Sequence, residues 1–309
     1  MSQSFQEVVA RWKAEKRQWV KESSYATYVR LINAHLLPFF SGKQPIDEPL
    51  IQLYANEKLA SGLSVKTIRD SLTVLKMILR YGEKTGAWLH TEFEVHFPTT
   101  AEKPDCLQIL SRAQQQSLLQ HLQVHFSFRN LGILICMHTG LRIGEVCGLQ
   151  WRDVDISAGI IHVRRTVQRI WLTDGPETIN ALSVGTPKTA SSVRDIPICK
   201  ALLQTLRPLA KVMLPDHYIV SNAAAPMEPR YFRAYFRKLL TRLDIPPIRF
   251  HALRHSFATR CIESRCDYKT VSALLGHSSI STTLNLYVHP DLAAKRRAIE
   301  QMARGMGRW

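Results

Sequence analysis

TGLRIGEVCGLQW, residues 139–151, places an arginine within a segment that otherwise has the composition of a buried helix. Leu141, Val146 and Leu149 are the apolar residues that suit such a helix. Arg142 stands among them, and Glu145 follows about one turn later, where the two side chains can pair. A structural ion pair explains this arrangement without any function, so a functional interpretation requires further residues of matching chemistry.

The segment TPKTASSVRDIPI, residues 186–198, contains Lys188 at a turn that includes a proline. A strand is expected to follow the turn, which predicts that the ammonium group lies at the tip of a hairpin. An isolated lysine in a turn is usually only solvated.

Two more segments in the second part of the chain carry unusual polar residues. In FHALRHSFATR, residues 250–260, His251 and Arg254 are three positions apart and therefore neighbours on one helix face. In LLGHSSISTTLNLYVH, residues 274–289, a glycine suited to end a helix precedes His277. A serine can then cap a short helix that presents Tyr287.

A zinc site is an alternative use of the histidines. His251 and His255 have the i, i+4 spacing of zinc ligands, and Cys261 and Cys266 follow. However, no glutamate lies between the histidines as in H-E-x-x-H, and the cysteine spacing matches no structural zinc pattern. The sequence therefore predicts no metal site and no cofactor.

The composition is that of a folded protein of about two domains, with 45% hydrophobic and 21% charged residues in 309 positions. Six scattered cysteines without a C-x-x-C pair indicate reduced thiols in a cytosolic protein. The N-terminus MSQSFQEVVARWK has no secretory pattern, and no apolar run is long enough to cross a bilayer. These features predict a cytoplasmic protein without a membrane span.

The charge is strongly basic and unevenly distributed. Lys and Arg number 41 against 25 Asp and Glu, a formal net charge of +16. Residues 1–105 carry only +2, whereas residues 106–309 carry +14. This excess favours a polyanion partner, above all nucleic acid, although a merely solvated cationic surface is the simpler alternative.

The predicted organisation is mainly α-helical with a small β insert. Residues 1–95 form a helical domain with expected helices at 5–19, 23–40, 47–60 and from 64 to the glycines at 82–86. Residues 96–106 are the expected linker, because they contain two prolines and little periodicity. Residues 107–309 form the second domain. Its expected helices are 112–123, 129–139, 231–243, 251–264, 268–275, 282–288 and 291–304, and its expected strands are 160–169 and 193–198.

One helix of the first domain carries a row of basic side chains beside its apolar face. The row is a candidate DNA-binding surface, with a solvated helix face as the alternative, and it comprises Lys66, Arg69, Lys76 and Arg80.

Taken together and in order, the unusual residues of the second part resemble the active-site set of the tyrosine recombinase (phage integrase) family. The matching segments are T-G-x-R-x-x-E, H-x-L-R-H, L-G-H and the final tyrosine. The corresponding catalytic residues are Arg142, Lys188, His251, Arg254, His277 and Tyr287. The resemblance is close over residues 107–289 and looser over 1–95, which looks like that family's helical core-binding domain.

The resemblance implies a site-specific DNA recombinase that cleaves and rejoins duplex DNA without ATP or metal. Tyr287 would be the nucleophile and leave a 3′-phosphotyrosine, while Lys188 would protonate the leaving 5′-oxygen. The two arginines would stabilise the phosphate charge, His251 would take or relay the tyrosine proton, and His277 would donate to the phosphate. Glu145 would orient the cations. The implied assembly is a homotetramer on two DNA partners with paired half-sites, exchanging strands through a Holliday junction.

Two other functions remain open from the sequence. A type IB topoisomerase shares the Arg, Lys and Tyr apparatus, but the L-G-H segment and the helical N-terminal domain favour the recombinase. A catalytically idle DNA-binding protein is the alternative from another class, and the complete six-residue set argues against it.

Overall fold

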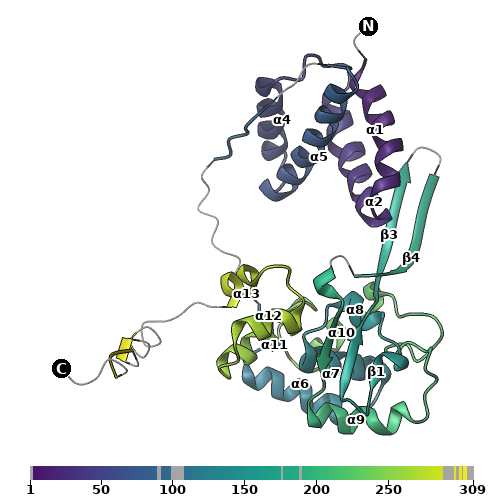
Figure 1. Cartoon of the computed structure of the whole chain (residues 1–309), viewed down its shortest axis with the longest axis vertical. Helices are drawn as coiled ribbons and strands as arrows, with labels where there is room; N and C mark the ends of the chain where they lie inside the picture. Colours follow the sequence, from purple (N-terminus) through teal and green to yellow (C-terminus); the bar gives the residue numbers. More distant parts are fainter. Residues whose placement is uncertain are drawn as a thin grey trace. The chain divides into compact units, whose positions relative to one another are not determined.

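The computed structural model describes residues 3–88, 92–98, 108–174, 177–187 and 190–287, together with 296, 299, 300 and 302–304. The chain folds into two compact units (Figure 1). Residues 1–103 and 169–181 form the first unit, and residues 104–168 and 182–309 form the second. The predicted domains are continuous stretches, whereas segment 169–181 comes from the predicted second domain and joins the first unit. Residues 99–107, which include most of the predicted linker, lie outside the described residues.

Five α-helices make up most of the first unit, and polar caps explain where three of them begin. Ser4, Asp47 and Ser64 each accept a hydrogen bond from a backbone N–H in the first turn of the helix that follows. The helices are α1 (Phe5–Trp19), α2 (Glu22–Leu31), α3 (Leu37–Phe40), α4 (Glu48–Ala60) and α5 (Val65–Lys84).

The second predicted helix differs from the observed one in its start. The predicted helix begins at Ser23, but Ser23 and Ser24 lie inside the first turn of α2, whose N-cap position is Lys21. A π-helical turn, Ile32–Leu36, then joins α2 to α3, so the helical path ends at Phe40 as predicted.

The apolar face predicted for α5 is confirmed by its burial. Ile68, Leu72, Leu75 and Leu79 are all at most 6% exposed. They pack in a core with side chains of the other helices, among them Phe5, Phe40 and Tyr54. The four basic candidates of α5 are exposed, as the opposite face of an amphipathic helix requires.

A long β-hairpin packs its outer end on α1 and α2. It consists of β3 (Thr166–Asp174) and β4 (Glu177–Gly185). Ile170 and Leu172 of β3 are buried against Tyr25 and other residues of α2. Asp174 accepts a hydrogen bond of 2.7 Å from the Tyr25 hydroxyl and forms an ion pair with Lys13. These contacts explain why residues 169–181 belong to the first unit.

The predicted strand 160–169 is in fact two strands. It is interrupted at Arg164 and Arg165, so that β2 (Ile160–Val163) ends there and β3 begins beyond it. β2 pairs antiparallel with both β1 (Val154–Asp155) and β5 (Arg194–Pro197) in a small sheet of order β1-β2-β5. The predicted strand at 193–198 corresponds to β5.

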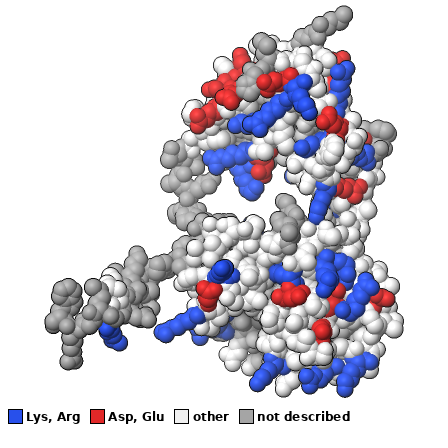
Figure 2. Space-filling model, viewed as in Figure 1, with Lys and Arg blue, Asp and Glu red and all other residues white. Residues whose placement is uncertain are grey.

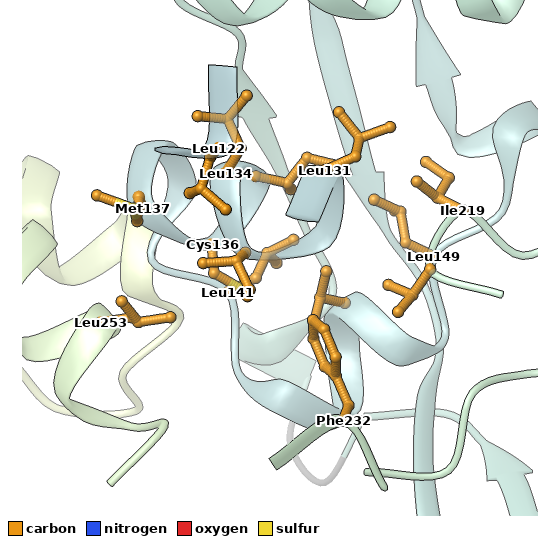
Figure 3. Close-up of a cluster of buried hydrophobic side chains, with 14 of the residues drawn as sticks. Leu122, Leu131, Leu134, Cys136, Met137, Leu141, Leu149, Ile219, Phe232 and Leu253 are labelled. Carbon is orange, nitrogen blue, oxygen red and sulfur yellow. The ribbon is translucent and has the colours of Figure 1, made fainter. Parts of the chain in front are cut away.

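The second unit is built around α7, which is buried along almost its whole length. Figure 3 shows side chains of this core, with Cys136 of α7, Leu141 after it, Phe232 of α10 and Leu253 of α11 among them. The helices of this unit are α6 (Arg112–Val124), α7 (Phe128–Thr139), α8 (Ile143–Cys147), α9 (Lys200–Ala210), α10 (Pro229–Arg242), α11 (Ala252–Glu263), α12 (Tyr268–Leu275) and α13 (Ile280–Tyr287). Helix α9 is not among the predicted helices.

Helices α11, α12 and α13 pack on one another, and α11 also packs on α7. Of the last predicted helix, 291–304, the described residues 296, 299, 300 and 302–304 are helical and the others lie outside the description. None of the described helices has the length and apolar composition of a membrane span.

Candidate active site

A glycine turn between α7 and α8 positions Arg142. Gly140 has a φ of 65°, in the left-handed region that favours glycine. A Cβ atom there would come within 2.6 Å of the Phe257 ring on α11. The turn can therefore form only without a side chain, and it places Arg142 immediately before α8.

Glu145 holds Arg142 in place, which confirms the predicted pairing. The carboxylate of Glu145 accepts hydrogen bonds from the Arg142 backbone N–H at 2.9 Å and from Arg142 Nη1 at 2.7 Å. The Glu145 side chain is only 2% exposed, whereas that of Arg142 is 35% exposed. Burial acts to raise the pKa of Glu145, but the hydrogen bonds and charge of Arg194 and the charge of Arg142 lower it overall. Glu145 is therefore an ionised carboxylate beneath a partly exposed guanidinium.

Arg254 reaches the same region from α11. Its residue surface is 2% exposed, and Nη1 donates a hydrogen bond of 2.9 Å to the carbonyl oxygen of Gly140. The turn that presents Arg142 thus also receives Arg254.

A second glycine turn presents His277. Gly276 ends α12 with a φ of 65°, and its carbonyl oxygen accepts a hydrogen bond of 3.2 Å from Arg142 Nη2. His277 Nδ1 lies 2.8 Å from the hydroxyl of Thr283, which is buried in α13. Burial and the nearby charges of Arg254, Arg142 and Arg194 lower the pKa of His277 to about 4. The imidazole is therefore neutral at neutral pH.

His251 stands at the N-terminal end of α11. Part of its surface is exposed, yet the protein atoms packed around the ring remove much of its hydration. This desolvation, together with His255, Arg254 and Arg142, lowers its pKa to about 4. A neutral His251 has a lone pair that can accept a proton. The ring of His255 lies against that of His251 at 4.6 Å between centroids.

Arg142 and His277 line one hollow of about 370 Å³. Residues of α8, β3, α13, the ends of the β4–β5 connection and the turn after α12 complete its wall, namely Glu145, Thr166, Gln168, Pro187, Ser192, Gly276, Ser278 and Thr282. Arg254 and His251 lie close enough to this hollow that the charges of Arg142 and Arg254 lower the pKa of both His251 and His277. A site with two guanidiniums and two neutral imidazoles is suited to bind and polarise a phosphate group.

The other two predicted catalytic residues are less fully described. Lys188 lies outside the described residues, although the preceding Pro187 lines the hollow. The described strands on either side of it, β4 and β5, belong to different sheets. The turn of the hairpin falls instead between Asp174 and Glu177. Tyr287 is the last residue of α13, and its side chain lies outside the description.

The basic row of α5 belongs to the first unit and makes only local contacts in the description. Lys66 pairs with Asp70, Arg69 lies over the ring of Phe97, and Lys76 lies over the ring of Phe93. Figure 2 shows Lys and Arg side chains spread over both units on the face in view, with acidic side chains among them.

Sequence reasoning missed two residues of the site, Arg194 and Thr283. Arg194 contacts Glu145, and Thr283 contacts His277. The sequence held one signal for Arg194. This arginine lies two positions before Ile196 in a predicted strand, so the two side chains share the face that is buried.

The chain matches the model of the phage integrase family over residues 108–293. The chain belongs to the phage integrase family. Residues 4–49 match the N-terminal SAM-like domain of phage integrases. The protein is thus a tyrosine recombinase, an enzyme that cleaves and rejoins DNA, as the sequence predicts.

Relatives along most of the chain agree with this membership. A tyrosine recombinase XerC-like protein of Caldanaerobacter subterraneus is 29% identical over 82% of this chain and 69% of its own. The ICEBs1 integrase of Bacillus subtilis is 28% identical over 87% of this chain and 74% of its own. The integrase of transposon Tn1549, solved with transposon right end DNA, has the same fold with a TM-score of 0.79 at 23% identity, covering 97% of this chain and 100% of that one.

The lowered pKa values of His251 and His277 predict how the folding stability of this recombinase depends on pH. An unfolded histidine has a pKa near 6.5, whereas His251 and His277 have pKa values of about 4 in the fold. Between pH 6.5 and 4 the unfolded chain binds protons that the folded protein does not, so stability should fall as the pH falls through this window. Above pH 6.5 both states are neutral and these groups add no slope.

Thermal unfolding midpoints measured between pH 7.5 and 4.5 test this expectation. The double variant His251→Gln/His277→Gln should lose less stability across the window than the parent protein. Equal losses in the two proteins would show that other groups, such as carboxylates, account for the whole slope.

Proposed function

We propose that the protein is a site-specific recombinase in which Tyr287 attacks a DNA phosphodiester and becomes linked to the 3′-phosphate. The gathering of Arg142, Arg254, His251 and His277 in one region supports this proposal most directly. These residues belong to the same unit as α13, whose last residue is Tyr287. A protonated tyrosine is a weak nucleophile with a pKa near 10, so it needs an electrophilic phosphate and a proton acceptor.

The proposed roles follow from the charge state of each group. Arg142 and Arg254 bind the non-bridging oxygens and stabilise the charge of the pentavalent transition state, a task that metal ions perform in other phosphoryl transfers. Neutral His251 accepts or relays the tyrosine proton, and neutral His277 donates a hydrogen bond to the phosphate. Lys188 protonates the leaving 5′-oxygen. Glu145 orients Arg142.

We further propose that Lys66, Arg69, Lys76 and Arg80 contact DNA phosphates from the first unit. Their exposure and their spacing along one face of α5 support this role. The proposed working assembly is a homotetramer that joins two duplexes, each with paired half-sites, and exchanges strands through a Holliday junction.

Footprinting on DNA that flanks the gene, followed by covalent capture, tests the proposed function. The footprint should reveal inverted half-sites, and a duplex nicked near the cleavage position should trap the protein on a 3′-phosphate in the presence of EDTA. Linkage to a 5′-phosphate would contradict the proposal. Relaxation of any supercoiled plasmid by monomers, without site preference, would favour a topoisomerase instead.

Thr283 offers a finer test of the role of His277. A neutral imidazole has one donor and one acceptor nitrogen. When the Thr283 hydroxyl donates to Nδ1, the ring proton stays on Nε2, where it can be donated to the phosphate. Thr283→Val keeps the shape but removes this donor, so cleavage should slow about 10-fold, equivalent to roughly 1.4 kcal/mol.

Single-turnover cleavage of the nicked duplex measures this effect. Thr283→Ser keeps the hydroxyl and serves as the matched control, with a rate close to that of the parent. A Thr283→Val protein that cleaves as fast as the Ser variant would show that the hydroxyl does not set the tautomer of His277.

A further inference from the structure

Arg194, the first residue of β5, is a buried cation in the second unit. Its side chain is 7% exposed, and its guanidinium makes four hydrogen bonds. Nη1 and Nη2 donate to the two carboxylate oxygens of Glu145 at 3.1 and 2.9 Å. Nε donates to the carbonyl oxygen of Leu274 at 2.6 Å, and Nη1 also donates to that of Ser192 at 3.0 Å. One side chain thus joins β5 to α8 and to the end of α12.

Glu145 lies between two guanidiniums of very different exposure. Arg194 is enclosed, whereas the side chain of Arg142 is 35% exposed and lines the hollow. The bidentate pair with Arg194 gives both Glu145 oxygens a hydrogen bond and compensates the carboxylate charge on the side away from the hollow. The three groups together retain one positive charge, and Arg142 is the cation that can offer it to an anion in the hollow.

Arg194 also supports the turn that presents His277. Leu274 is the second-last residue of α12, and its carbonyl oxygen accepts a hydrogen bond from Nε of Arg194. A Cβ atom on Gly276 would lie 3.1 Å from Cδ of Arg194, so the arginine stem packs directly against the turn. The same side chain therefore contacts the structures that carry Arg142 and His277.

We propose that Arg194 is a positioning residue for DNA cleavage, holding Arg142 through Glu145 and His277 through the end of α12. The inference rests on the proposed function, because it concerns the binding of the scissile phosphate by those two residues. Arg194 itself does not touch the phosphate. Without the Arg194 side chain, the Glu145 carboxylate would pull Arg142 away from the hollow. The turn before His277 would also lose the hydrogen bond from Arg194 to Leu274.

A purely structural role is the competing explanation, because breaking any buried ion pair destabilises a protein. The two explanations differ in what they predict for rate, affinity and coupling. Positioning acts on the transition state, where a misplacement of about 1 Å costs around 10²-fold in rate. Half-site affinity, to which one phosphate site contributes a small share, should barely change.

The experiment measures single-turnover cleavage, half-site Kd and thermal unfolding for the parent and its variants at a temperature where each is folded. Arg194→Gln should cleave about 10²-fold more slowly with Kd within about 3-fold of the parent. Arg194→Lys keeps the charge but cannot form the fork, so it should recover part of the rate. Arg260→Gln is the matched control, because Arg260 also binds a carboxylate and a backbone carbonyl, those of Glu263 and Leu110. Its cleavage rate should equal that of the parent.

A double-mutant cycle identifies the route. In a Glu145→Gln background, Arg194→Gln should cause a much smaller further loss than in the parent, since the two residues act together. The proposal would be overturned if the rate losses of Arg194→Gln and Glu145→Gln multiplied fully in the double variant. It would also be overturned if Arg194→Gln cleaved at the parental rate, or if Arg260→Gln lost as much cleavage rate as Arg194→Gln. It is overturned as well if neither Arg194→Gln nor Arg194→Lys shows a cooperative unfolding transition, because the residue then serves stability. A parent protein that forms no adduct would instead refute the proposed function, and the inference with it.

Discussion

Tyr287→Phe is expected to abolish the covalent protein–DNA adduct while half-site binding persists. Phenylalanine has the same ring but no oxygen, so no phosphoester can form. The backbone should tolerate the change, because Tyr287 is the last residue of α13, four positions after Thr283, and α13 is held against α11 and α12. The expected effect is therefore a complete loss of chemistry without a loss of fold.

Capture on the nicked duplex, followed by denaturing electrophoresis, measures the adduct, and a mobility shift on intact half-site DNA measures binding. Tyr268→Phe is the matched control, since Tyr268 begins α12 and is 39% exposed. That variant should form the adduct at the parental rate. An adduct that survives in Tyr287→Phe would show that another side chain is the nucleophile.

Local sequence patterns predicted the elements whose stability depends mainly on their own residues. The apolar face of α5 follows from residue spacing within one helix, and the starts of α4 and α5 lie close to the predicted positions 47 and 64. The pairing of Arg142 with Glu145 was predictable for the same reason, because the partners are three positions apart.

The hairpin was not predictable in this way. A two-stranded ribbon is marginal alone and depends on a surface to pack against. For β3 that surface is α2, where Tyr25 lies 149 positions before Asp174. The hairpin therefore depends on a contact that periodicity along the chain does not reveal, and the predicted strand ended at residue 169.

The missed site residues have the same explanation. Arg194 and Glu145 are 49 positions apart, and Arg194 and Leu274 are 80 apart. In the sequence Arg194 is one charged residue in a short strand, and only the fold shows that its charge is enclosed. The family resemblance guided the prediction to the side chains expected at the phosphate but not to those behind them.

Lys188→Ala is expected to slow cleavage by about 10² to 10⁴, the usual value of a positioned proton transfer. The proposed task of Lys188 is to protonate the 5′-oxygen as it leaves, because an alkoxide is a poor leaving group. Pro187, the preceding residue, lines the hollow that also contains Arg142 and His277, which supports this assignment. DNA affinity should change little, because one phosphate contact among many is a small share of binding. Lys200→Ala, at the exposed start of α9, is the matched control and should cleave normally.

A substrate with sulfur in place of the bridging 5′-oxygen separates proton donation from phosphate binding. A thiolate leaves without protonation, so Lys188→Ala should cleave this substrate at nearly the parental rate. Arg142→Ala should not be rescued, because its defect is the lost stabilisation of charge on the non-bridging oxygens, which sulfur at the bridging position does not restore. If the sulfur substrate fails to rescue Lys188→Ala, the lysine is a phosphate or DNA contact. The proton donor would then have to be another group, and His251 is the next candidate, once it carries the proton taken from Tyr287.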